Sequence, residues 1–156
     1  MPRSLAQEIG KKRPFELPEE EAYLSLVRTS NDISGAFRNL FKTQGLSEAM
    51  YNVLRIVGGS GSEGRPCSEI GRDMVVRVPD VTRLVDRLEG QGLVERSRSA
   101  KDRRVVSIRI TPDGETLLER LRGPLHQTLR AEMGRLSKSE LKDLSLLLAK
   151  LRSDDH

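Results

Sequence analysis

Guanidinium groups are concentrated in one short segment of this 156-residue chain. Five cations fall within nine consecutive residues there: Arg96, Arg98, Lys101, Arg103 and Arg104. Apolar and polar residues alternate on either side of them, which predicts a β-hairpin over residues 92–110 with the cations crowded at its tip. A guanidinium donates paired hydrogen bonds to phosphate oxygens, so the pattern favours phosphate binding. The alternative interpretation is a solvated charged surface.

Arginine is also enriched in the wider segment 65–109. This segment holds eleven Lys and Arg against seven Asp and Glu, and ten of the eleven cations are arginine. Its excess of four positive charges equals the formal net charge of the whole chain, +4. Arginine binds guanine edges and enters narrow minor grooves as well as contacting phosphate, so double-stranded DNA is the expected partner.

A predicted helix comes directly before the hairpin, over residues 80–89. Its apolar residues recur at helical spacing and should face inward: Val81, Leu84, Val85 and Leu88. Four polar residues lie around its start: Arg77, Asp80, Thr82 and Arg83. We expect these four to reach base edges or phosphates, because a helix followed by a basic hairpin is the plan of a winged helix-turn-helix. The alternative is a solvated helix face.

The composition favours helices elsewhere in the chain. Hydrophobic residues make up 36% and aromatic residues only 3%, with no tryptophan, so the interior must be mainly Leu, Val and Ile. We expect a mainly α fold with a small β-wing, forming one intertwined domain per subunit. Its parts are an N-terminal arm and dimerisation helix in 1–45, a winged helix-turn-helix in 46–110, and C-terminal dimerisation helices in 111–156.

Capping residues, glycines and prolines set the expected boundaries. The first expected elements are a short helix and an arm in 1–15, a helix from Pro18 to near Gly45, and a helix capped by Ser47. A flexible connector in 58–64, a helix over about 67–74 and a turn in 75–79 should follow. The next helix should carry Asp80 in its first turn and end at Gly90 or Gly92. After the hairpin, Thr111 should cap a long helix that Pro124 kinks. Ser137 should start the last helix.

A leucine stripe in the last helix indicates a subunit interface. Four leucines recur there at spacings of three and four: Leu141, Leu144, Leu148 and Leu151. Together with Leu146 and Leu147 they are more than a small core can cover, and helices this apolar rarely stay exposed. We therefore expect a symmetric homodimer in which the long N-terminal helix and the last two helices interlock.

At this point the chain resembles the MarR family of bacterial winged-helix regulators. The resemblance lies in the order of the elements and in four motifs: VTRLVDRLE at 81–89, GLVER at 92–96, DRR at 102–104 and ITPDG at 110–114. It implies that Arg104 enters the minor groove while Asp102 holds its guanidinium in position. The alternative is an exposed ion pair with little energetic effect. The chain departs from the commonest family pattern in the turn 75–79, which lacks the usual glycine and small capping residue.

The resemblance also implies a function. We expect a dimeric, sequence-specific DNA-binding transcriptional regulator, a repressor that binds an inverted-repeat operator and is released by a small effector. Members of the family often bind small anionic or phenolic effectors, and five residues could line such a site: Phe37, Arg38, Phe41, Met50 and Tyr51. These residues could equally be plain core. The alternative function is a winged-helix module that binds another protein and no DNA.

Other functional classes find little support in the residues. Two histidines and one cysteine form no catalytic constellation, and the glycines of 58–64 lack the Lys and Ser of a phosphate-binding loop, so we expect neither enzyme activity nor a cofactor or metal. Cys67 could be a redox sensor at a helix start, or simply a buried small residue. No apolar run approaches a membrane span and no secretory segment is recognisable, so we expect a cytoplasmic protein.

Overall fold

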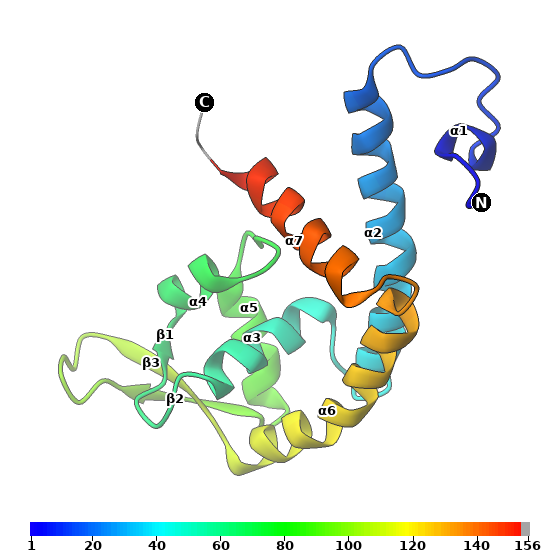
Figure 1. Ribbon diagram of the computed structural model, residues 1–156. Helices are drawn as coiled ribbons and strands as arrows, with labels where there is room; N and C mark the ends of the chain where they lie inside the picture. The colour runs from blue at the N-terminus through cyan, green and yellow to red at the C-terminus, as the bar shows by residue number, and fades with distance from the viewer. Residues whose placement is uncertain (154–156) are drawn as a thin grey trace.

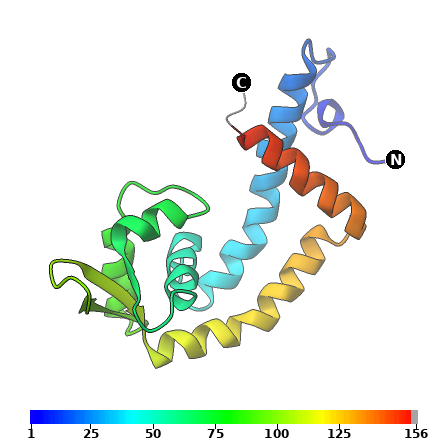
Figure 2. The ribbon, with the colours of Figure 1, turned by 60° about the vertical axis from the view of Figure 1, so that its left-hand side comes forward.

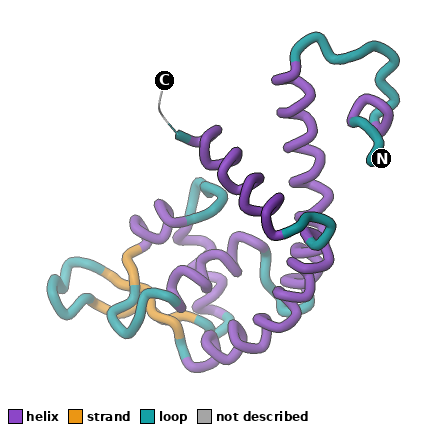
Figure 3. The backbone as a smooth tube through the Cα atoms, viewed as in Figure 1, coloured by secondary structure: helices purple, strands orange, loops and turns teal. Residues whose placement is uncertain are grey.

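The computed structural model describes residues 1–153, so the last three residues of the expected segment 111–156 lie outside it. The chain is mainly helical with one small sheet, as expected (Figures 1 and 3). The elements are α1 (Leu5–Glu8), α2 (Pro18–Lys42), α3 (Glu48–Gly58), β1 (Arg65–Pro66), α4 (Cys67–Asp73), α5 (Val81–Gly90), β2 (Val94–Arg98), β3 (Val106–Ile110), α6 (Pro112–Met133) and α7 (Lys138–Arg152).

Side-chain caps begin the helices where the sequence indicates. Ser47 Oγ accepts the N–H of Met50 at 3.1 Å, and Thr111 Oγ1 accepts the N–H of Gly114 at 3.1 Å. One expected boundary was wrong. Asp80 does not lie in the first turn of α5 but is its N-cap, because its Oδ1 accepts the N–H of Arg83 at 3.4 Å.

The sheet contains a strand that the sequence did not reveal. β1 pairs antiparallel with β3, and the sheet order is β1-β3-β2. A strand of two residues, one of them Pro66, offers no alternation from which to predict it. The connector also begins later than expected, since α3 continues through Gly58.

α6 continues through Pro124 to Met133 without a break. Proline removes one hydrogen bond from a helix and crowds the preceding turn, which bends the helix axis. Figure 2 shows α6 curving along its length from the wing toward α7. The helix therefore bends while remaining a single element.

Residues 46–110, which we call the winged body, surround an aliphatic core. Five large side chains from α3, α4, α5 and β3 are fully buried: Leu54, Ile70, Val85, Leu88 and Ile108. The first half of α6 closes the core with Leu117 and Leu121. Val81 and Leu84 are half-buried beside it, so the inward face predicted for α5 is confirmed.

The helices outside the winged body are much more open. In Figures 1 and 2 most of α2 and all of α7 stand away from the winged body. α2 buries only Phe41, and α7 buries no residue at all. Of the α7 leucines, Leu151 is 76% exposed, while Leu141, Leu144 and Leu148 are half-buried. None of the helices in residues 1–153 is both long and apolar enough to cross a membrane.

Candidate nucleic-acid interface

The wing is an ordered hairpin with a folded tip. β2 and β3 pair in register from Val94 opposite Ile110 to Arg98 opposite Val106. In the loop, the N–H of Ser99 donates to the carbonyl of Val105 at 2.9 Å. The Val105 N–H donates in turn to the carbonyl of Asp102 at 3.0 Å. The cations of this loop are therefore presented from a fixed backbone.

Asp102 shapes the wing tip differently from the role expected for it. Its Oδ1 accepts the backbone N–H of Arg104 at 2.9 Å, whereas the family resemblance implied a contact with the Arg104 guanidinium. Within residues 1–153 that guanidinium forms no ion pair. The carboxylate fixes the backbone of the tip and leaves the Arg104 side chain free to meet a ligand.

Two further cations at the tip, Arg98 and Lys101, form contacts with other residues, and a third, Arg103, is exposed. Arg98 Nη1 donates to the carbonyl of Arg103 at 3.2 Å. Lys101 Nζ lies 3.7 Å from a carboxylate oxygen of Glu63 in the connector, and both side chains are more than three-quarters exposed. Four cations are thus exposed at the wing tip, Arg98 at the end of β2 and Lys101, Arg103 and Arg104 in the loop that follows it.

Arg96 has a structural role that the sequence interpretation did not include, because its guanidinium pairs with two acids of the winged body. Nη2 lies 2.5 Å from Asp86 Oδ1 and Nη1 lies 3.1 Å from Glu89 Oε1, both on α5. The Arg96 N–H also donates to Glu89 Oε2 at 3.2 Å. The Asp86 hydrogen bond raises the pKa of Arg96 further above its ordinary value. Arg96 therefore ties the wing to α5.

The start of α5 presents exposed polar side chains, as expected. Arg77 and Thr82 are exposed, and the Arg83 side chain is 83% exposed. Arg83 Nε lies 3.4 Å from the second carboxylate oxygen of Asp80, so the N-cap residue also pairs with this cation. Because Arg96 joins α5 to β2, the exposed cations at the start of α5 and those at the wing tip are held in a fixed relation to each other.

A cavity of about 610 Å³ lies between α2, α3, the turn after α4, and α6. Three of the five residues expected to bind an effector line it: Phe37, Phe41 and Tyr51. The Phe41 and Tyr51 rings are stacked with centroids 4.3 Å apart. Arg38 and Met50 are not among the lining residues, since Arg38 is exposed and Met50 is buried in the core.

The cavity has further lining residues that the sequence interpretation missed, among them the acid Glu48 on α3. Arg55 and Asn52 contribute from α3, and Val75 and Val76 from the turn before α5. Burial raises the pKa of Tyr51, and the nearby Arg55 cation acts in the opposite direction. The position of Arg55 four residues after Tyr51, on the same helix face, was the available signal for it. Nothing in the sequence pointed to Asn52 or to the turn.

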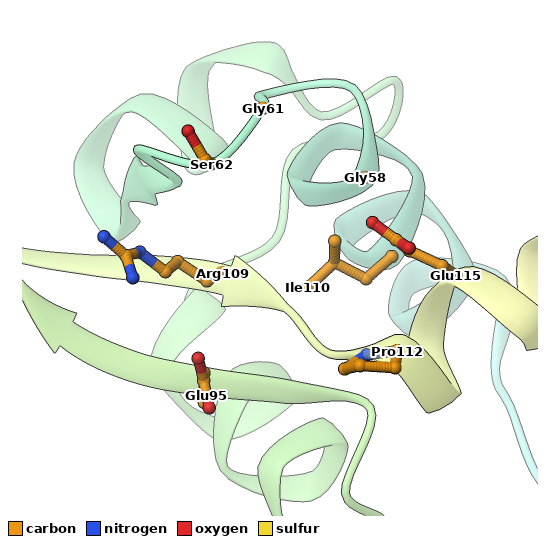
Figure 4. Close-up of a pocket in the computed structure, with 8 residues that line it drawn as sticks. All are labelled: Gly58, Gly61, Ser62, Glu95, Arg109, Ile110, Pro112 and Glu115. Atoms are coloured by element: carbon orange, nitrogen blue, oxygen red, sulfur yellow. The ribbon is translucent and has the colours of Figure 1, made fainter.

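A smaller cavity of about 370 Å³ lies at the root of the wing (Figure 4). Arg109 and Glu95 flank it from directly opposite positions on β3 and β2, and Glu115 flanks it from α6. The start of α6 meets the wing closely here, because a Cβ added to Gly114 would lie 2.2 Å from the carbonyl oxygen of Leu93. Only glycine fits there, so the root of the wing is fixed against α6.

Cys67 lies half-buried at the start of α4, against the core. Burial raises the pKa of its thiol, and this outweighs the opposing effect of Arg96. A raised pKa disfavours the thiolate that redox chemistry needs, which supports the structural interpretation of this residue. Within residues 1–153 no three His, Cys, Asp or Glu residues gather in a way that could hold a metal.

Comparison with known proteins identifies the family. Residues 46–106 match the MarR family. A MarR transcription factor from Planctomyces limnophilus, known from its crystal structure, is 36% identical with a TM-score of 0.66, covering 88% of this chain and 98% of that chain. The repressor MdtR of Bacillus subtilis (strain 168) is 29% identical over 82% of this chain and 81% of its own length.

The transcriptional repressor MprA of Escherichia coli (strain K12) is 28% identical over 73% of this chain, and the match spans 65% of MprA, just under two thirds of its length. Three of the four motifs that suggested the resemblance fall within the matched residues 46–106. The winged helix-turn-helix places them along α5, at the root of the wing and at its tip. The chain belongs to the MarR family of transcriptional regulators.

Proposed function

We propose that this regulator is a homodimeric repressor that binds an inverted-repeat operator in double-stranded DNA. The observation that carries the proposal is the pair of exposed cation groups, one at the start of α5 and one at the wing tip, joined by the Arg96 brace. A rigid two-part surface loses little conformational freedom on binding, so its contacts convert efficiently into affinity.

In this arrangement α5 enters the major groove. Arg77, Thr82 and Arg83 reach base edges or phosphates from its first turn, while Asp80 caps the helix. The wing lies along the backbone, where Arg98, Lys101 and Arg103 contact phosphates. Arg104 enters the adjacent minor groove, where narrow A·T-rich segments attract arginine.

The open helices supply the second half of the proposal. Leu146, Leu147 and Leu151 of α7 are 59, 63 and 76% exposed, and α2 exposes Leu26 and Val27. Apolar patches of this kind mark subunit interfaces, and a twofold dimer would bury them against their own copies. Two α5 helices related in this way fit half-sites about 34–36 Å apart, one helical turn of DNA.

The cavity gives the regulator a place for a small effector. Its aromatic and aliphatic walls suit a small planar ligand, and Arg55 and Glu48 on α3 add one charge of each sign. A ligand there touches α2 and α6 on one side and the turn before α5 on the other. A ligand that moves these elements changes the spacing of the two α5 helices in the dimer. Such a change weakens DNA binding strongly, because both half-sites must be engaged together.

Selection of bound fragments from random double-stranded DNA, followed by anisotropy titration of the recovered sequence, tests the proposal. We expect an inverted repeat, and affinity that falls steeply with salt at a slope of about −0.9 per phosphate contacted. A purified protein with no preference among duplexes at low salt would instead support a protein-binding module.

A further inference from the structure

Asn52 connects the cavity wall to the turn that precedes α5. The residue lies on α3 and lines the cavity of about 610 Å³. Its Oδ1 accepts a hydrogen bond of 2.8 Å from the backbone N–H of Val75, which lies 23 residues further along the chain. Val75 in turn lies five residues before Asp80, the N-cap of α5. One side-chain amide thus joins the two regions.

The two ends of this turn are held by packing, since Met74 is buried in the core and Val78 packs against it, but its middle is held by little else. Within the described residues 1–153, the Asn52 bond is the one hydrogen bond that ties residues 74–79 to another element. Val75 and Val76 are 82 and 71% exposed, so their side chains bury little apolar area. Pro79 has no N–H to donate. The backbone position of Val75 and Val76, between these two packed residues, therefore depends strongly on this bond.

The turn is also part of the cavity wall, which exposes the bond to a ligand. Val75 and Val76 line the cavity together with Asn52 and Arg55. A ligand oxygen near Val75 would compete with Asn52 for its N–H, and ligand bulk over Asn52 would push the turn outward. Either contact alters the segment that leads directly into α5.

We propose that Asn52 is a positioning residue that holds the turn in its DNA-binding arrangement, and that a cavity ligand lowers DNA affinity by breaking the Asn52–Val75 hydrogen bond. The inference rests on the proposed function, because it assumes operator binding and an occupied cavity. Coupling between two sites requires an element whose arrangement both sites influence, and the turn satisfies that requirement.

Three variants test the positioning role. Asn52→Ala removes the acceptor, Asn52→Asp keeps an acceptor at the same place, and Ser30→Ala alters the cavity wall from α2 without touching the turn. We expect Asn52→Ala to lower operator affinity about tenfold, as the loss of one hydrogen bond predicts, while the other two stay within about twofold of wild type. Amide hydrogen exchange at Val75, measured by NMR without DNA, should accelerate only in Asn52→Ala.

A cavity-filling variant tests the regulatory part without an unidentified ligand. Ser34→Phe places a ring in the cavity from α2. We expect it to lower operator affinity and accelerate Val75 exchange in the wild-type background. In the Asn52→Ala background it should add little, because both changes act on the same bond.

The outcomes separate this inference from the proposed function. Wild-type protein that binds no operator refutes the proposed function, whatever Val75 exchange does. Operator binding that is equal in wild type and Asn52→Ala, or Val75 exchange that is equal in both, overturns the positioning role alone. If the effects of Ser34→Phe and Asn52→Ala on the free energy of operator binding are fully additive, the regulatory role is overturned.

Discussion

The winged body and α7 are held in place by different kinds of interaction. The winged body surrounds Leu54, Ile70 and Ile108, none of which is accessible to solvent. α7 buries no residue, and its ends are defined instead by local caps such as Ser137. Contacts within the winged body therefore determine the shape of the proposed DNA-binding surface. The spacing between two such surfaces depends instead on contacts outside the winged body.

The largest expected effect is a loss of stability when a buried leucine of the winged body is truncated, compared with an exposed leucine of α7. Leu54→Ala should lower the free energy of unfolding by about 2–5 kcal/mol, because it leaves a cavity in a closed core. Leu147→Ala is the matched control, since Leu147 is 63% exposed within its subunit. Urea denaturation at a protein concentration that keeps the subunits apart measures both. Equal losses of unfolding free energy in the two variants would contradict the contrast between the buried core and α7.

The next prediction concerns what covers α7. Leu144→Asp should weaken the dimer about a hundredfold or more, because a carboxylate in an apolar interface loses its hydration. Leu144→Met conserves the volume and apolar character of the side chain and should leave the dimer intact. Sedimentation of both variants at micromolar concentration provides the measurement. A Leu144→Asp variant that still sediments as a dimer would mean that the leucine stripe packs inside its own subunit.

Local patterns were sufficient to predict much of the fold. Ser47, Thr111 and Ser137 cap helices because their side chains bond to residues three positions away, a relation that the sequence displays directly. The alternation in 94–98 and 106–110 likewise predicted the wing. β1 was missed because two residues carry no periodic signal.

Features that depend on tertiary contacts were harder to predict. Arg96 and Arg98 look alike in the sequence, and only the packing of α5 against β2 brings Asp86 and Glu89 to Arg96. The spacing of those two acids by three residues, which places them on one helix face, was the signal that could have indicated a shared cation. Asn52 gave no such signal, because its partner is a backbone N–H 23 residues away.

A smaller effect separates a binding arginine from a bracing one within the winged body. Arg104→Met should lower operator affinity about tenfold, as the loss of a charged hydrogen bond predicts, and should leave the free energy of unfolding unchanged. Arg96→Met, its matched counterpart, should lower the free energy of unfolding by about 1 kcal/mol, a modest amount because the ion pairs are partly solvated. Anisotropy titration and urea denaturation of both variants make the comparison. Unchanged affinity in Arg104→Met would remove the wing tip from DNA binding.

The smallest effect tests whether α7 depends on its cap rather than on burial. Ser137 donates its backbone N–H to Glu140 Oε2 at 2.7 Å, which lowers the pKa of Glu140 below its ordinary value of 4.5. The contribution of the carboxylate to α7 is therefore complete above pH 4.5 and is lost as the pH falls through the lowered pKa. NMR shifts of the first turn of α7 should change over this range, while those around Leu54 should not.

Glu140→Gln is the control for this titration, because a neutral amide keeps the capping geometry without an ionisable group. It should remove the pH dependence of the first turn of α7 and leave the remainder of the helix unchanged. Shifts around Leu54 that follow the same titration would mean that α7 and the winged body respond as one unit. The division between a self-contained surface and a separately positioned outer helix would then be wrong.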